Sequence, residues 1–116
     1  MDRILIVVIC ALSLAACKPT EKDFINIGES LVRDNLKDPD SAKFDSFYHS
    51  SGESDGYVCG LINSKNSYGG YIGKKPYYVY IETKDGKLEN HGPIVIANDD
   101  DQAVLENFRL LCNREI

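Results

Sequence analysis

The sequence predicts an α+β fold, in which a small antiparallel sheet of three to four strands is flanked by an N-terminal and a C-terminal helix. Apolar residues recur at helical spacing near both ends of the chain, and segments of alternating apolar and polar residues lie between them. An Asp85-Gly86 pair between two of those segments is typical of a tight hairpin. We expect one domain over residues 23–116, with both helices packed on one face of the sheet.

The first predicted helix begins at a capping signal, in which Thr20 is followed by Asp23. We expect about 15 residues of helix, ending at Asp38-Pro39 because proline disfavours helical geometry in the residue before it. The apolar stripe of this helix consists of Phe24, Ile27, Leu31 and Leu36. Residues 40–43 are then expected to turn into the sheet.

The middle of the chain contains the predicted strands, which cover residues 44–49, 57–66, 77–83 and 88–91. In the second of these, apolar residues lie on both faces, so we expect both faces to be partly covered. In the third, Tyr77, Val79 and Ile81 alternate with Tyr78, Tyr80 and Glu82, which predicts an aromatic outer face. Residues 50–56 have the composition of a loop.

The last predicted helix follows the apolar stretch of residues 94–97. Asp99 and Gln102 form a second capping signal, and the acidic run at residues 99–101 suits the positive end of a helix dipole. Its apolar stripe consists of Val104, Leu105, Phe108, Leu111 and Cys112.

Residues 1–16 have the layout of an export signal, with Arg3 near the start, an apolar core and two small residues before Cys17. Leu14-Ala15-Ala16-Cys17 resembles the lipobox of bacterial lipoprotein signals, in which the cysteine is lipidated. We therefore expect a signal peptide over residues 1–16 and a lipidated tether over residues 17–22. Acyl chains on Cys17 would hold the protein stably at a membrane without spanning it.

Lys18 follows the predicted lipidation site, which by resemblance to enterobacterial lipoproteins favours the outer membrane. The expected location is thus the bacterial cell envelope, with the domain facing the oxidising periplasm or the cell surface. In such a compartment the two cysteines of the domain, Cys59 and Cys112, are expected to form a disulfide bond. Cys10 would be removed with the signal peptide.

Charge and composition narrow the function classes. The net charge is −5, and cleavage would remove one Arg and one Asp and leave it unchanged. No basic cluster is denser than Lys74-Lys75, so nucleic acid is not an expected partner. His49 and His91 have no nucleophile motif beside them, and the acidic run lacks the alternate spacing of a calcium loop. We expect no catalytic residue, no metal site and no cofactor.

A glycine- and tyrosine-rich segment follows the second predicted strand, and all seven tyrosines lie between residues 48 and 80. Tyrosine is enriched in protein interfaces because it gives contact area with a polar tip at low entropy cost. These tyrosines are equally consistent with a surface that recognises a partner and with side chains that only cover one face of the sheet. The candidate binding surface consists of Asn63, Lys65, Asn66, Tyr68, Gly69, Gly70, Tyr71, Tyr78 and Tyr80.

Two segments, Asp38–Phe44 and Val58–Gly73, resemble the patterns D-P-x-S-A-x-F and V-C-G-x-x-N-x-K-N-x-x-G-G-Y-x-G. These patterns are found in a family of small bacterial and phage-associated proteins of unassigned function, often behind a lipoprotein signal. The resemblance covers roughly residues 36–81 and implies no activity. It implies that the Asn63–Tyr71 residues of the pattern act together, either as a structural turn or as a binding surface.

These observations favour a membrane-anchored envelope protein that binds another protein and is not an enzyme. Exclusion or immunity, by masking a receptor or an incoming toxin, is one role that fits. An assembly accessory that docks its sheet onto an envelope complex is the alternative. An envelope enzyme using His49 or His91 as a base is the weakest hypothesis.

Overall fold

The computed structural model describes residues 18–98 and 100–114. The predicted signal peptide, Cys17 and Asp99 lie outside the described residues. The elements are α2 (Glu21–Arg33), the 3₁₀ turn η1 (Pro39–Ser41), β1 (Lys43–Ser50), β2 (Asp55–Asn63), β3 (Lys75–Lys84), β4 (Lys87–His91), β5 (Val95–Ile96) and α3 (Gln102–Cys112). The predicted α+β fold is confirmed.

The sheet is antiparallel, in the order β1-β2-β3-β4. The two-residue strand β5 also pairs with β3, opposite Tyr77 and Tyr78, whereas β4 pairs with the other end of β3. β3 and β4 are joined by Asp85 and Gly86, and both residues have positive φ angles, 54° and 77°. The predicted hairpin turn is thereby confirmed, since a two-residue hairpin of this kind needs positive φ at both positions.

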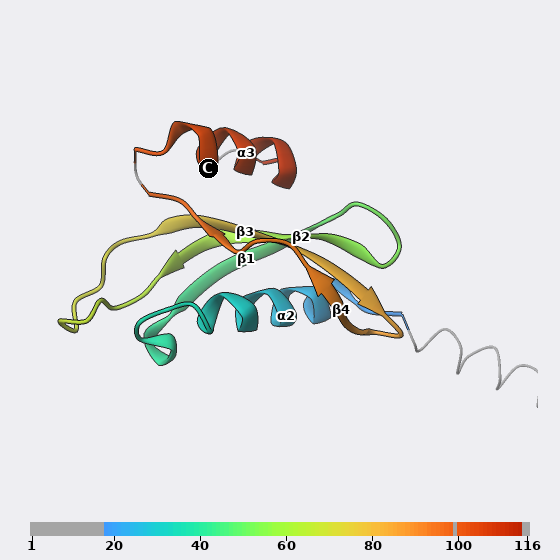
Figure 1. The fold of residues 1–116 in the computed structure, drawn as a ribbon, viewed down its shortest axis with the longest axis horizontal. Coiled ribbons are helices and arrows are strands. Elements are labelled where there is room, and N and C mark those ends of the chain that lie inside the picture. The colour runs from blue at the N-terminus through green and yellow to red at the C-terminus, as the bar shows by residue number, and fades with distance from the viewer. Residues whose placement is uncertain (1–17, 99, 115–116) are drawn as a thin grey trace, which may run out of the picture.

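The two helices cover opposite faces of the sheet (Figure 1). The prediction that both lie on one face is therefore wrong. The physical reason lies in β2, where Val58 packs into the cluster beneath α2 while its neighbour Cys59 faces α3. Successive side chains of a strand point to opposite faces, so a strand that is apolar on both faces needs a cover on each.

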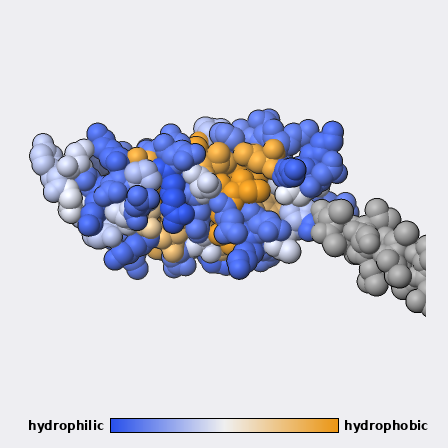
Figure 2. Space-filling model, turned by 90° about the horizontal axis from the view of Figure 1, so that it is seen from below, coloured by the Kyte–Doolittle hydropathy of each residue, from blue (hydrophilic) through white to orange (hydrophobic). Residues whose placement is uncertain are grey.

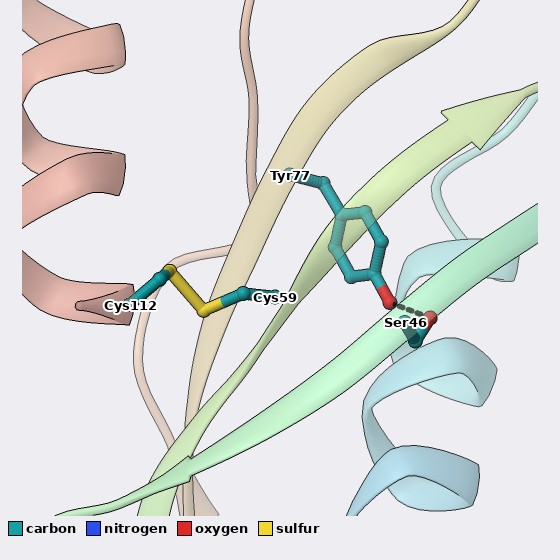
Figure 3. The surroundings of a disulfide bond; sticks show 4 residues. All are labelled: Ser46, Cys59, Tyr77 and Cys112. Carbon is teal, nitrogen blue, oxygen red and sulfur yellow. Dashed lines mark hydrogen bonds between the residues drawn. A yellow bond between two sulfur atoms is a disulfide. The ribbon is translucent and has the colours of Figure 1, made fainter. Parts of the chain in front are cut away.

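The larger core lies between the sheet and α2. Its buried residues are Phe24, Val32, Val58, Ile62, Tyr77, Val79 and Ile81. Figure 2 shows this side of the molecule, where apolar side chains gather near the middle of a largely hydrophilic surface. Tyr77 crosses β2 at Gly60 to hydrogen-bond with Ser46 of β1 (Figure 3). A Cβ at Gly60 would lie 2.0 Å from the carbonyl oxygen of Asp45, so only glycine fits there.

The smaller core lies between the sheet and α3. It consists of Cys59, Tyr78, Phe108 and Cys112, with Phe47 packed edge-on against Phe108. The predicted disulfide between Cys59 and Cys112 is confirmed, with a Cα–Cα distance of 6.2 Å (Figure 3). The bond joins β2 to the last residue of α3 and thus attaches the second layer covalently to the sheet.

Several element boundaries differ from the prediction. The helix α2 has the predicted cap, because the backbone N–H groups of Thr20 and Asp23 each donate to the side chain of the other residue, but it ends at Arg33 rather than near Asp38. The strand β2 ends at Asn63 instead of residue 66. The helix α3 is capped by Asp101, whose side chain accepts from the Val104 N–H at 3.2 Å, and not by Asp99.

Candidate binding site at one end of the sheet

The connection between β2 and β3, residues 64–74, is the tip loop, and it extends beyond one end of the sheet (Figure 1). It contains most of the predicted binding residues. The described part of the chain begins at the opposite end of the molecule, just before α2 (Figure 1). The end of the surface on the left of Figure 2 has intermediate hydropathy, in keeping with the tyrosine, glycine and serine content of the tip loop.

The side chain of Asn66 closes the outermost turn of the tip loop. Its Oδ1 accepts hydrogen bonds from the backbone N–H groups of Tyr68 (2.9 Å) and Gly70 (3.2 Å). The Asn66 N–H donates to the Gly70 carbonyl at 2.9 Å, and the Gly69 N–H donates to the Asn66 carbonyl at 3.1 Å. Gly69 has a φ of +82°, a conformation that favours glycine. Residues 66–70 thus form an internally hydrogen-bonded turn.

This turn displays Tyr68, whose side chain is 97% exposed. Tyr71 and Ile72, on the returning side of the tip loop, are 43% and 49% exposed. A side chain as exposed as that of Tyr68 buries almost no apolar surface, so it adds little to the stability of the fold. The tip loop therefore presents an aromatic side chain on an ordered backbone.

The base of the tip loop is tied to the end of the sheet. Asn63, the last residue of β2, accepts a hydrogen bond from the Gly73 N–H through its side chain at 3.0 Å. The Ile72 N–H donates to the Ser64 carbonyl at 3.2 Å, and Lys65 forms an antiparallel bridge with Tyr71. The two sides of the loop are consequently held together below the turn at Asn66.

A second segment of the chain supports the tip loop from the side. Ser41, in η1, accepts a hydrogen bond from the Lys65 N–H at 2.9 Å and donates to the Asp38 carbonyl at 2.7 Å. The hydroxyl of Tyr71 donates to the Ser41 carbonyl at 3.1 Å. The segments Asp38–Phe44 and Val58–Gly73 therefore meet at this end of the molecule.

Lysine side chains surround the ring of Tyr71. The Lys43 Nζ lies 4.6 Å and the Lys65 Nζ 5.5 Å from its centroid, within the range of cation–π interactions. A shallow hollow of about 180 Å³ adjoins Lys43 and is lined also by Asn63 and Lys74. Two ammonium groups therefore lie close to the ring of Tyr71.

Two residues of the predicted surface lie elsewhere. Tyr78 is buried beneath α3, packed with Cys59 and Phe108. Tyr80 lies further along β3, away from the tip loop, and donates a hydrogen bond to the Asp55 carboxylate. That hydrogen bond, together with burial, raises the pKa of Tyr80 above its ordinary value. The structure thus brings together the residues from Asn63 to Tyr71 and separates them from Tyr78 and Tyr80.

The histidines lie far apart in the sheet order. His49 is on β1 and His91 on β4, with β2 and β3 between these two strands. The His91 ring bonds to the Gly92 carbonyl, and neither imidazole contacts a hydroxyl or carboxylate of a described residue. Among residues 18–98 and 100–114, no group of three or more His, Cys, Asp or Glu side chains is arranged to hold a metal ion.

The sequence pattern missed Ser41 and Lys43 as parts of this site. Both belong to the first of the two segments that resemble the family, but Lys43 lies 4.6 Å from the ring of Tyr71 only because η1 turns the chain against the tip loop. In the sequence, the only indication that Asp38–Phe44 and Val58–Gly73 form one site was that both match the same pair of patterns.

Comparison with known proteins finds no matching family model, no similar curated protein and no similar solved structure. Neither α2 nor α3, the two α-helices in the described part of the chain, is long and apolar enough to cross a membrane.

Proposed function

We propose that this chain is a lipoprotein of the bacterial envelope, attached to the outer membrane through Cys17, that binds another protein with its tip loop. The observation that carries the proposal is the exposure of Tyr68, 97%, on a turn that is closed by its own hydrogen bonds. Aromatic residues dominate the binding energy of interfaces when they enter a pocket of the partner. The proposed function requires no catalytic residue.

The order of the tip loop supports binding. Fixing a mobile residue costs about 1–2 kcal/mol of backbone entropy, and a flexible loop must meet that cost when it binds. In the tip loop, contacts from Asn66 and Ser41 already hold the backbone before any partner arrives. A partner would therefore gain most of the contact energy of Tyr68.

The position of the tip loop supports the same proposal. The start of α2, which follows the proposed tether, lies at the opposite end of the molecule from the tip loop (Figure 1). An anchor on Cys17 would leave the short tether near the membrane and direct the tip loop away from it. This orientation favours a partner that approaches from the periplasmic or external space.

The anchor is tested by replacing Cys17 with serine and labelling cells with a clickable palmitate analogue. We expect the wild-type chain to incorporate the label and to fractionate with the outer membrane, and Cys17→Ser to lose both properties. Equal labelling of the two chains would contradict lipidation at Cys17.

The binding surface is tested with a photo-crosslinking amino acid placed at position 68 in living cells. Position 110 is the matched control, because Leu110 is 68% exposed on α3, on a different part of the surface. We expect one discrete adduct from position 68 and none from position 110. Adducts from both positions, or from neither, would contradict a specific site at the tip loop.

Two roles of such binding are separated by further experiments. In exclusion or immunity, deletion of the gene should change sensitivity to phage, plasmid transfer or a rival strain. In an assembly accessory, co-purification from crosslinked membranes should recover one abundant resident complex. The free edge of β1, which pairs only with β2 among the described strands, would offer such a complex a site for sheet extension.

A further inference from the structure

The charge around the tip loop is opposite to that of the whole chain. Between Leu61 and Ile81 the sequence has Lys65, Lys74 and Lys75 and no aspartate or glutamate, although the net charge of the chain is −5. Lys43 of β1 adds a further ammonium group, above the ring of Tyr71. The connection between β2 and β3 is therefore basic in an acidic protein, although Asp38 and Asp40 flank it in and before η1.

These ammonium groups are not neutralised within the described residues. Lys43, Lys65 and Lys74 form no ion pair there, and the one described ion pair, Arg109 with Glu106, lies on α3. The hollow beside Lys43 has Lys43 and Lys74 on its walls, with Asn63 and the carboxylate of Asp45 as further polar groups. Its volume of about 180 Å³ leaves room for a carboxylate-bearing side chain.

We infer that the tip loop recognises an acidic segment of a protein partner, with partner carboxylates on Lys43, Lys65 and Lys74 and Tyr68 in an apolar recess beside them. This inference rests on the proposed function and specifies its ligand. Opposite charges across an interface speed encounter and select among partners. A lipid surface fits less well, because the tip loop and the start of α2, which follows the proposed tether, lie at opposite ends of the molecule (Figure 1).

One acidic residue at the hollow provides a variant that should strengthen the binding of an acidic segment, whereas the loss of a lysine should weaken it. Asp45 of β1 is exposed, lines the hollow with Lys43 and Lys74, and would repel an entering carboxylate. Asp45→Asn should therefore strengthen the binding of an acidic segment by about twofold. A purely structural effect of this change would not strengthen binding.

The experiment selects random short peptides, displayed on phage, on the protein extracted from membranes in detergent. We expect the selected peptides to be enriched in Asp and Glu over the input. The variant Lys43→Gln/Lys65→Gln/Lys74→Gln should bind a selected peptide about tenfold more weakly, since each exposed ion pair contributes a factor of about two to five. The control Lys22→Gln/Lys84→Gln/Lys87→Gln removes the same charge away from the tip loop and should bind as the wild type does.

Salt gives a second readout. The affinity of a selected peptide should fall about tenfold between about 0.05 M and about 0.5 M sodium chloride, because exposed ion pairs are screened. Selected peptides without acidic enrichment, or equal losses in the two triple variants, would overturn the inference. Tighter binding of polygalacturonate or of phosphatidylglycerol vesicles than of the selected peptides would also overturn it, in favour of an anionic glycan or lipid.

The experiments distinguish a failure of the acidic ligand from a failure of protein binding by the tip loop. If position 68 forms its adduct in cells and the lysine variants leave that adduct unchanged, the tip loop binds a protein but the acidic ligand is wrong. If position 68 forms no adduct, the proposed function itself fails.

Discussion

Reduction of the disulfide between Cys59 and Cys112 should destabilise the protein strongly and should release α3 first. The bond closes a loop with a sequence separation of 53 residues. In the chain-entropy model, a loop of this length restricts the unfolded state by about 4 kcal/mol at 25 °C. Domains of this size are stable by about 5–15 kcal/mol, so the bond supplies a large share of the total.

Apart from the disulfide, α3 is held by Phe108 and by the partly buried side chains of Val104 and Leu111, which pack against the smaller core. Of its residues, Phe108 and Cys112 are buried, whereas Leu110 is 68% exposed. Burial of one phenylalanine contributes about 2–3 kcal/mol. An isolated helix as short as Gln102–Cys112 is unstable in water. The larger layer with α2 keeps its own buried cluster around Val58 and Tyr77, so it should remain folded when α3 detaches.

The assay compares oxidised and reduced wild-type protein by urea denaturation and by amide hydrogen exchange. We expect the free energy of unfolding to fall by about 4 kcal/mol at most, with less loss if α3 detaches before global unfolding. Amides of α3 should lose protection while those of β2 and β3 keep it. The variant Cys59→Ala/Cys112→Ala is the control for incomplete reduction. A loss under about 1 kcal/mol, or full protection of α3 after reduction, would refute the reasoning.

Three further predictions follow from the contacts of single residues. Gly28→Ala would place a Cβ 2.6 Å from the Cβ of Val58, so urea denaturation should show a loss of about 1–3 kcal/mol. Adding Val58→Gly, which removes the Cβ and both γ-methyl groups, should make that loss smaller than it is in the wild-type background, and an unchanged loss would contradict the clash. Burial raises the pKa of Tyr77 above its ordinary value of 10.0. The neutral phenol is thus favoured in the folded state, so the contribution of Tyr77 to stability should be constant below about pH 9 and fall as the pH rises through 10 and beyond. Because the pKa values of Tyr48 and Tyr80 are raised as well, Tyr77→Phe should make this fall shallower in urea denaturation without removing it, and an equally steep fall would contradict the reasoning. Asn66→Ala removes an acceptor from two backbone N–H groups, so the amides of Tyr68 and Gly70 should exchange about 2- to 12-fold faster by NMR. Unchanged exchange would show that other contacts hold the turn.

The elements of the fold were predictable because local signals decide them. Thr20 and Asp23 form the capping box that their spacing predicts, and Asp85-Gly86 forms the hairpin turn. The disulfide followed from the expected oxidising compartment and not from geometry. Each of these features depends on residues close in sequence or on the count of cysteines.

The placement of α3 was not predicted, although β2 contained the relevant information. Cys59 and Val58 are neighbours, so they point to opposite faces, and the partner of Cys59 is in α3. Both helices have one apolar stripe, and such a stripe does not indicate which face of the sheet the helix covers. The same alternation places Tyr78 on the face of Cys59, where α3 covers it. Tyr78, which the sequence analysis assigned to the binding surface, is therefore a core residue between the sheet and α3.

The site was predictable only within the tip loop. Asparagine followed by two glycines indicates a turn, and Asn66 closes one. The contact of Ser41 with Lys65 joins residues 24 positions apart, and no local pattern predicts such a pair.

The length of the tip loop argues that it has a role beyond joining two strands. In the same sheet, Asp85 and Gly86 alone connect β3 to β4. Residues 64–74 connect β2 to β3, and ordering each additional residue costs about 1–2 kcal/mol of backbone entropy. Hydrogen bonds from Asn66 and Ser41 offset part of that cost, yet the outermost side chain, Tyr68, remains 97% exposed. Ordered backbone without burial is unfavourable for the isolated fold, which is why we assign the compensating contacts of Tyr68 to a partner.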